Sequence, residues 1–371
     1  MFQYTGEYKK HASSGRDNMN FYTFTPAPLC DGISMPVDNE LFSLLTMAHK
    51  LLGVLEGMVM LSQDSDIIKE LLCLSEGYYS LLIDDENTEA FRDVLKAYAA
   101  KRKDLQHINN IVAAQKYSHG RPISNSELSK ICSFIIYGTE SSHAAEIRSK
   151  QIFFRRVLTN LKMYTPTAPE DVLPALNDLT KFIRIDNHTD ILIKAALVHY
   201  QFDMIHPFEK RNGAVGRILM PMMLLDAQYQ AASYLCISEF LYRNKEEYFD
   251  KLSATQQGNG YSYWIKFFVQ ALCYAADRAI NQINQFAEIV AEDATQLTIL
   301  VKSSKHVIPI YNYFKQHLIS EIKPVAENIG VSYNTAAKVV GNLRDAGILT
   351  LEHEQSRHKV YCHRALEIFE S

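Results

Sequence analysis

Two apolar helical segments joined by a polar loop constrain the fold of this 371-residue chain more than any other feature. Asp190 is a favourable N-cap for the segment ILIKAALVHYQFDMI, and a second apolar run extends from Ile218 to Leu225. A helix that is apolar on most of its faces belongs in the centre of its domain. We therefore expect two buried helices that fix the intervening loop at both of its ends.

Helical periodicity also dominates much of the remaining chain. Apolar residues recur at three- and four-residue spacing in the segments 39–58, 66–83, 87–116, 126–136, 170–183, 212–229, 239–256 and 261–295. Residues 1–38 show little periodicity and are expected to form an arm on the surface of a domain. Aromatic and β-branched residues around Thr159 and Asn160 indicate a short hairpin within 147–165. The pattern predicts a mainly α fold.

A polar break at Lys302–Lys305 precedes what reads as a separate small domain, residues 302–371. A helix at about 306–319, a second at Pro324–Ile329, a turn at Gly330, a third helix from Ser332 and two strands around 348–362 are expected there. This order is typical of a winged helix-turn-helix. The side chains that such a domain could offer to DNA are Tyr333, Asn334, Lys338, Arg357, His358 and Lys359.

Charge leaves the role of this C-terminal segment open. Residues 301–371 carry nine Lys and Arg against seven Asp and Glu, which is a small excess for a DNA-binding domain. Winged helices also serve in dimerisation and docking. DNA binding and a protein contact therefore both remain as interpretations.

Composition narrows the cellular setting. Hydrophobic residues make up 47% of the chain and charged residues 22%, as in ordinary globular proteins. The six cysteines occur singly, which favours reduced thiols over a disulfide framework or a zinc site. The first residues lack the apolar stretch of a signal peptide, and the run Ile218–Leu225 is too short to span a bilayer. We expect a cytoplasmic protein without a membrane partner.

The loop between the two apolar helices carries residues suited to phosphate chemistry. Pro207 ends the first helix, and Asn212-Gly213 begins the second. A helix N-terminus offers unpaired N–H groups and partial positive charge, which suit a phosphate. His206 is placed to act as a general base beside it, and Arg217 could hold a terminal phosphate with its planar guanidinium.

The loop resembles that of the Fic family, whose pattern runs His, Pro, Phe, any residue, an acidic residue, Gly, Asn, Gly, Arg, two residues, Arg. The matching positions are His206, Pro207, Phe208, Asn212, Gly213 and Arg217. The segments HYQFDMIHPF, ISEFLYRNKEEYFDKL and YWIKFF are also similar to the family, so the resemblance extends over residues 25–371. It implies a Fic-type helical domain over 39–298, with a small β-hairpin flap, followed by the winged helix-turn-helix.

The resemblance also implies an activity and a set of roles. Such a protein transfers AMP from ATP to a hydroxyl of a target protein or of itself, with His206 as the base, and often forms a homodimer. The residues that would bind the nucleotide are Arg211, Asn212, Gly213, Gly216 and Arg217, with Tyr248 and Gln256 at the adenine. The flap residues Ile152, Phe153 and Phe154 would dock the target segment by strand addition.

Many Fic proteins carry an inhibitory helix that reads Ser or Thr, three residues, Glu, then Gly or Asn. Its glutamate pairs with the last arginine of the loop and misplaces the γ-phosphate of ATP. Here Ser80 and Asp84, in the segment 70–85, occupy the matching places. Asp84 is one methylene shorter than glutamate, so the sequence leaves open whether it reaches Arg217.

Three loop positions depart from the family pattern. Lys210 replaces the acidic residue that coordinates Mg²⁺, Arg211 replaces a glycine, and Ala214 replaces the first arginine. Either the adjacent Glu209 supplies a carboxylate, or Lys210 and Arg211 substitute for the charge of the metal. Two functions follow: an AMP transferase, or a weak or inactive relative that binds ATP and acts as a regulatory or DNA-binding protein.

Overall fold

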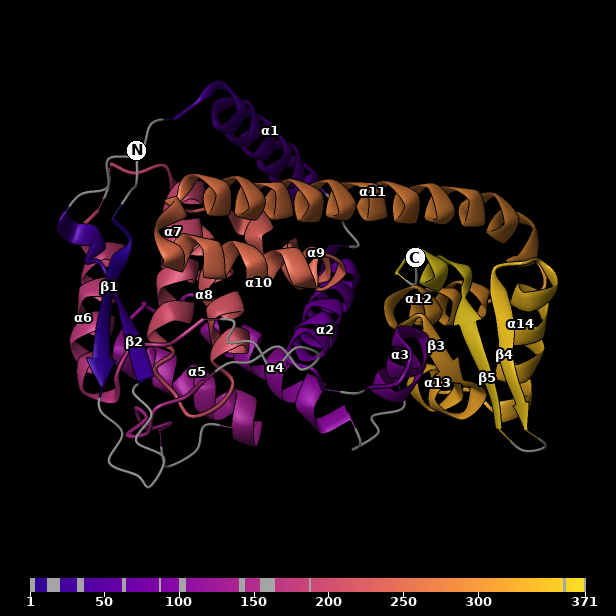
Figure 1. The fold of residues 1–371 in the computed structure, drawn as a ribbon. Helices are drawn as coiled ribbons and strands as arrows, with labels where there is room; N and C mark the ends of the chain where they lie inside the picture. Colours follow the sequence, from indigo (N-terminus) through magenta and orange to yellow (C-terminus); the bar gives the residue numbers. More distant parts are fainter. Residues whose placement is uncertain are drawn as a thin grey trace. The chain divides into compact units, whose positions relative to one another are not determined.

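The computed structural model describes residues 4–11, 21–31, 37–61, 65–86, 88–99, 105–139, 144–153, 164–186, 188–355 and 358–369. These residues are mainly helical (Figure 1). They divide into two compact units. Unit 1 comprises Met1–Gly57, Leu72–Asn87 and Gln106–Asp277, and unit 2 comprises Met58–Leu71, Thr88–Leu105 and Arg278–Ser371.

Most helices belong wholly or largely to unit 1. They are α1 (Asn39–Leu61), α2 (Ser65–Ile83), α4 (Gln106–Ser118), α5 (Asn125–Tyr137), α6 (Pro169–Ile185), α7 (Ile191–Ile205), α8 (Asn212–Asp226), α9 (Ile237–Arg243), α10 (Lys245–Ala254) and the first part of α11 (Ser262–Leu300). Pairs of neighbouring helices, α4 with α5 and α7 with α8, pack closely against each other.

Helix α7 is the central helix of unit 1. The Asp190 carboxylate caps it by accepting hydrogen bonds from the backbone N–H groups of Leu192 and Ile193, at 2.9 and 3.4 Å. All its residues from Leu192 to Ile205 are buried. The buried central helix expected from its all-round apolarity is confirmed, and so is its N-cap.

The N-terminal arm contains an antiparallel strand pair. Strands β1 (Gly6–His11) and β2 (Phe21–Pro26) pair in the register Gly6 to Pro26 through His11 to Phe21. Phe24 is fully buried, and Thr5 donates a hydrogen bond of 2.9 Å to the carbonyl of Thr255. The arm is therefore an integral layer of unit 1, with more regular structure than its sequence indicated.

Two expected helices are each divided in the structure. The segment 87–116 gives α3 (Phe91–Ala99) and α4, and the segment 239–256 gives α9 and α10. Asn244 separates the latter pair in a non-helical conformation, and its side-chain amide donates to the carbonyl of Phe240 at 2.9 Å. A side chain that competes for backbone carbonyls in this way ends a helix without disturbing its apolar periodicity.

Among the described residues, α1 is the helix that is long and apolar enough to cross a membrane, by length and composition alone, and 22% of its most apolar window is buried. The sequence analysis overlooked it by considering only the run Ile218–Leu225. Within unit 1, Leu41, Leu45 and Leu52 of this helix are buried. The Glu56 carboxylate accepts a hydrogen bond of 2.8 Å from the backbone N–H of Ala231.

Unit 2 contains the C-terminal elements and α3. The C-terminal elements are α12 (Val307–His317), β3 (Ile319–Glu321), α13 (Ile322–Ile329), α14 (Tyr333–Asp345), β4 (Leu349–Gln355) and β5 (His358–His363). The strands form an antiparallel sheet in the order β3-β5-β4. Gly330 ends α13 at φ 72°, and Ser332 caps α14 by accepting from the N–H of Thr335 at 3.2 Å. The helices and hairpin expected here are present, while β3 was not foreseen.

Apolar side chains from the three C-terminal helices and from β4 and β5 form the core of unit 2, and α3 adds a polar contact. The core includes Val307, Phe314, Val325, Val340 and Leu349. On α3, Arg92 and Lys96 both pair with Glu352 of β4, at 2.5 and 2.7 Å. A segment far from the C-terminus in sequence is therefore part of this unit, which a boundary at residue 302 does not anticipate.

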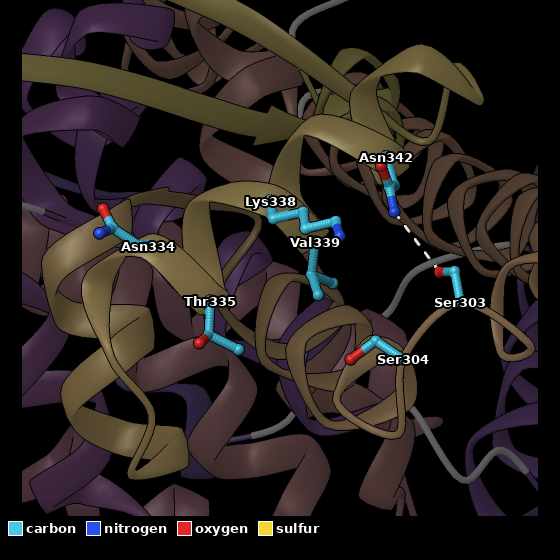
Figure 2. A pocket seen from close by; sticks show the side chains of 7 residues that line it. All are labelled: Ser303, Ser304, Asn334, Thr335, Lys338, Val339 and Asn342. Carbon is cyan, nitrogen blue, oxygen red and sulfur yellow. Dashed lines mark hydrogen bonds between the residues drawn. The ribbon is translucent and has the colours of Figure 1, made fainter.

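A polar pocket of about 350 Å³ lies between the α11–α12 connection and α14 (Figure 2). Its lining residues are Ser303, Ser304, Asn334, Thr335, Lys338, Val339 and Asn342. The amide of Asn342 donates to the Ser303 hydroxyl at 3.4 Å. Six of the seven lining residues carry a hydroxyl, amide or ammonium group, so the pocket offers hydrogen-bonding partners to a ligand.

Candidate functional site

His206 lies at the junction where α7 ends and the loop begins. Its backbone N–H donates to the carbonyl of Phe202 at 2.9 Å, and its own backbone adopts the left-handed conformation, with φ 50° and ψ 62°. Pro207 follows and prevents α7 from continuing. A non-glycine residue in this region costs about 1–3 kcal/mol, and such residues cluster at functional sites. The turn places His206 at the start of the loop with its side chain 9% exposed.

The imidazole of His206 is held in its neutral form. Burial, and secondly the positive charge of Arg148, lower the pKa of His206 to about 3, while a hydrogen bond with the backbone of Asp203 opposes the shift. A neutral imidazole can accept a proton, as a general base must.

This shift gives a prediction for stability against pH. Unfolded His206 has an ordinary pKa near 6.5 and takes up a proton that the folded protein does not bind between about pH 6.5 and 3. Stability conferred by neutral His206 is therefore present above pH 6.5 and falls by about 1.4 kcal/mol per pH unit as the pH drops through this window. Urea unfolding at pH 7 and pH 5 should show a smaller loss for His206→Gln than for the parent protein. Equal losses would contradict the buried, neutral imidazole.

Arg148 anchors the loop through backbone carbonyls. This buried guanidinium donates to the carbonyls of His206 at 2.7 Å, Ile205 at 3.2 Å and Lys150 at 3.0 Å, and also to that of Thr167. Burial lowers the pKa of Arg148 to about 10, which still leaves it cationic at neutral pH. One side chain thus joins the end of α7 to the segments on both sides of the expected flap, and the sequence analysis missed it.

Backbone contacts also join the segment around Arg148 to the loop that follows α7. The N–H of Arg148 donates to the carbonyl of Pro207 at 2.9 Å, and Ile147 forms an isolated antiparallel bridge with Phe208. Of the expected flap, Ile152 is half-buried and Phe153 is 42% exposed. Phe154 and the expected hairpin turn at Thr159-Asn160 lie outside the described residues.

Asn212 closes the loop on itself. Its side-chain oxygen accepts from the N–H of Phe208 at 2.8 Å, and its amide donates to the Phe208 carbonyl at 2.7 Å. The side chain is 1% exposed. Asn212 therefore shapes the loop from within, and it begins α8, whose free N–H groups follow at Gly213 and beyond.

Arg217, in the second turn of α8, contacts the end of α2. Its guanidinium donates to the Ser80 hydroxyl, the Ser80 carbonyl and the Asp84 carboxylate, each at 2.9 Å. The Arg217 side chain is 2% exposed and that of Asp84 25% exposed. The shorter aspartate does reach the arginine, which resolves the geometric question left open by the sequence.

Asp84 also occupies the N-terminus of α8. A Cβ atom placed on Gly213 would lie 3.0 Å from the Asp84 carboxylate and 2.8 Å from the Arg217 guanidinium. A side chain at position 213 would have to displace the Arg217 guanidinium and the Asp84 carboxylate from these positions. The position suited to a phosphate on electrostatic grounds holds a carboxylate in this conformation.

The two residues that follow Asp84 in the chain, Asp85 and Glu86, also form ion pairs. Lys245 of α10 donates to Asp85 at 2.5 Å and to the carbonyl of Leu82 at 3.1 Å, and Arg211 pairs with Glu86. Sequence reasoning missed Lys245 and Glu86. The run of three acidic residues at the end of a helix was a visible signal, but its partners lie more than 100 positions away.

The remaining residues expected to bind the nucleotide, Gly216, Tyr248 and Gln256, are buried. A Cβ on Gly216 would meet Phe202 at 3.2 Å, so this glycine permits α7 and α8 to pack closely. Tyr248 is 2% and Gln256 is 4% exposed, and Gln256 forms hydrogen bonds of 2.9 and 3.1 Å with the backbone of Thr165. Other groups of unit 1 cover all three residues in this conformation, and their expected roles at the nucleotide stay predictions.

Tyr248 belongs to a buried polar network behind the loop. Its hydroxyl donates to Asp203 at 2.7 Å and lies 3.1 Å from Nε2 of His199, whose Nδ1 lies 3.2 Å from the carbonyl of Gly216. Burial raises the pKa of Asp203 and lowers that of His199. His199 is therefore a buried, hydrogen-bonded residue of the core.

The donor set around the loop does not fit Mg²⁺. A hard divalent cation needs oxygen ligands, and the expected position of the carboxylate holds the ammonium of Lys210. The neighbouring Glu209 is exposed. Throughout the described ranges, no group of three or more His, Cys, Asp or Glu side chains is placed to hold a metal ion.

Comparison with known proteins agrees with this geometry. Residues 99–224 match the model of the Fic/DOC family. A probable protein adenylyltransferase from Aquifex aeolicus is 27% identical over 95 residues, covering 26% of this chain and 27% of the relative. The protein adenylyltransferase Fic from Nematostella vectensis is 26% identical over 141 residues, covering 37% and 29%. The chain thus aligns with less than a third of the length of either relative.

A solved structure extends the likeness in fold over most of the chain. The Fic family protein from Desulfovibrio desulfuricans G20 superposes with a TM-score of 0.60 at 15% identity, covering 89% of this chain and 97% of that one. The match to the family model includes the whole segment from α4 to His206, the loop and most of α8. The chain thus carries a Fic/DOC-family domain over residues 99–224, and the described residues share the mainly helical fold of the solved Fic family protein.

Proposed function

We propose that the protein transfers AMP from ATP to a hydroxyl side chain of a target protein or of itself. The observation that carries this proposal is the placement of a neutral His206 at the start of the loop and of Arg217 in the second turn of α8, the helix into which the loop leads. The adenylyltransferase names of the matched relatives support it further. A helix N-terminus and a guanidinium are the groups that bind a polyphosphate.

In the proposed reaction, the target hydroxyl oxygen attacks the α-phosphorus of ATP. The bond from the α-phosphorus to the bridging oxygen breaks, and pyrophosphate leaves. His206 takes the hydroxyl proton, and its backbone carbonyl is held by Arg148 during the step. The N-terminus of α8 and Arg217 stabilise the negative charge of the phosphates once Asp84 has moved away.

Removing the base tests the proposal. Protein incubated with ATP labelled on the α-phosphate, alone and with cell lysate, should transfer label, and His206→Ala should reduce transfer by about 10²–10⁴-fold. His188→Ala, at an exposed position just before α7, is the matched control and should label like the parent. Label transfer by His206→Ala at the parental rate would sink the proposal.

A second candidate function is a nucleotide-binding regulator without turnover. It is favoured by Lys210 and by Ala214, whose fully buried methyl group leaves one fewer cation for phosphates. Calorimetric ATP binding without label transfer under any condition would support this candidate. Label transfer that depends on His206 would exclude it.

In this second reading the C-terminal elements of unit 2 deliver the output to DNA as a winged helix-turn-helix. Helix α14 presents Tyr333, which is 53% exposed, together with the exposed Asn334 and Lys338. Lys338 and Asn334 also line the polar pocket of Figure 2, whose hydroxyl and amide groups suit a backbone phosphate. On strand β5, Lys359 is exposed, whereas Arg357 and the side chain of His358 lie outside the described parts.

A further inference from the structure

Three consecutive carboxylates at the end of α2 each contact a different cation around the loop. The pairs are Asp84 with Arg217 at 2.9 Å, Asp85 with Lys245 at 2.5 Å, and Glu86 with Arg211. We call the segment Asp84–Glu86 the acidic segment. The cations come from α8, from α10 and from the loop itself, so the acidic segment ties three elements of unit 1 together.

The backbone of the acidic segment is folded to make these contacts. Asp85 has a left-handed conformation at φ 60°, and the N–H of Glu86 donates to the carbonyl of Leu81 at 3.2 Å. The turn directs successive carboxylates to different cations. Asp84 is the deepest of them, because it lies against Gly213 at the N-terminus of α8. This array of negative oxygens around helix N–H groups and guanidinium groups resembles the charge pattern of a polyphosphate.

Arg211 shows that this arrangement involves a conformational penalty. It holds φ 67°, a conformation that costs a residue with a side chain about 1–2 kcal/mol and that glycine adopts freely. Its guanidinium is 17% exposed and meets Glu86, which also lies 2.8 Å from Nδ1 of His107. The ion pair offsets part of the strain. Arg211 therefore places a positive charge next to Glu86, at a position where the backbone conformation alone would favour glycine.

Compared with the Fic family pattern, the loop lacks the metal-binding carboxylate and carries additional positive charge. Lys210 replaces a carboxylate, and Arg211 adds a guanidinium next to it. Guanidinium and ammonium groups bind phosphates directly and neutralise them without a bridging ion. A bound Mg²⁺–nucleotide complex would bring a divalent cation close to Lys210, which electrostatic repulsion disfavours.

We propose that the loop binds the polyphosphate of a nucleoside triphosphate through Arg211 without a divalent cation, and that Glu86 of the acidic segment competes with the nucleotide for this guanidinium. The inference rests on the nucleotide site of the proposed function and deepens it. Glu86 acts on Arg211 as Asp84 acts on Arg217, so the two carboxylates oppose binding at separate points. Release of the acidic segment and nucleotide binding are then one coupled equilibrium.

Calorimetric titration with ATP tests the metal and the carboxylates separately. The full-length His206→Ala protein is used so that no turnover occurs, and ATP is titrated in EDTA and in excess MgCl₂. Magnesium should not tighten binding. Glu86→Gln should tighten it about fivefold by freeing Arg211, and Arg211→Ala should weaken it by about tenfold or more. Asp85→Asn provides a second variant of the acidic segment and should also tighten binding.

Glu247→Gln is the matched control, because it makes the same charge change in an exposed ion pair of α10 with Lys251. It should leave ATP affinity unchanged. Tightening of ATP binding by magnesium of tenfold or more would overturn the metal-independent site, as would binding that Arg211→Ala does not affect. Equal ATP affinities of the Glu86→Gln, Asp85→Asn and Glu247→Gln proteins would overturn the proposed competition between the acidic segment and the nucleotide.

The readout separates this inference from the proposed function. ATP binding in EDTA that depends on Arg211 supports the inference, even if the parent protein transfers no label. Label transfer that requires magnesium would support the proposed function and contradict the inference. Failure of the inference and failure of the proposed function therefore give different results.

Discussion

Replacing Asp84 by alanine is expected to raise AMP transfer by about 10- to 100-fold. The Asp84 carboxylate pairs with a guanidinium that is almost completely buried, and it occupies the N-terminus of α8 at Gly213. A hydrogen bond to a charged group contributes about 1.5–3 kcal/mol, and each 1.4 kcal/mol corresponds to a tenfold change in an equilibrium. If the closed arrangement must open before ATP binds productively, losing this contact raises the competent fraction by that factor.

The measurement is the initial rate of label transfer from α-labelled ATP. Asp66→Ala, which removes an exposed carboxylate from the first turn of the same helix, serves as the control and should match the parent. Asp84→Asn keeps a side-chain carbonyl oxygen that can accept from Arg217 but loses the negative charge, so it should give an intermediate rate. An unchanged rate for Asp84→Ala, with transfer still dependent on His206, would show that this ion pair does not limit activity.

Local sequence patterns predicted the helices well because helical periodicity is a local property. Apolar residues at three- and four-residue spacing located α2, α5, α6 and α7 to within a few residues, and Asp190 located the start of α7. The division between α9 and α10 was missed, since a competing side chain at Asn244 leaves the periodicity intact. Strand β3 has three residues, too few for an alternating pattern to register.

The sequence predicted only part of the candidate site, because some of its contacts join residues that are far apart in the chain. The loop is contiguous, so His206, Asn212 and Arg217 could be read from one short segment. Arg211 and Glu86 are 125 positions apart, and no periodicity connects them. Side-chain burial is equally non-local. Tyr248 and Gln256 appeared suited to a ligand, yet each is enclosed by the network it forms within unit 1.

The loop geometry also depends on groups that no motif specifies. His206 and Arg211 both hold left-handed backbone conformations, which their own side chains disfavour. The surrounding contacts must offset these costs. Asn212 fixes the interior of the loop through both groups of Phe208, and Arg148 fixes its beginning through the carbonyls of Ile205 and His206. The loop is therefore as rigid as its anchors, and Arg148 is the anchor with the most contacts.

Replacing Arg148 by methionine is expected to reduce AMP transfer by about 100-fold or more and to destabilise the protein by about 3 kcal/mol. Methionine has a similar length but cannot donate, so the carbonyls of Lys150, Thr167, Ile205 and His206 all lose a partner in a buried setting. Each unsatisfied buried polar group costs about 1–3 kcal/mol, although relaxation and water recover part of the sum. A displacement of about 1 Å at the reacting groups can cost about 100-fold in rate.

A loss of stability alone would not show that Arg148 positions the base, so the decisive measurement is the pKa of His206 by NMR titration of its ring. Burial is the larger cause of its low pKa and remains in the variant, whereas the second cause, the charge of Arg148, is removed. The pKa should therefore rise in Arg148→Met but stay below its ordinary value. Arg148→Lys retains the charge with fewer donors, so it should preserve the low pKa while recovering only part of the transfer rate. A His206 pKa that is identical in all three proteins would mean that Arg148 acts only as a structural support for the backbone.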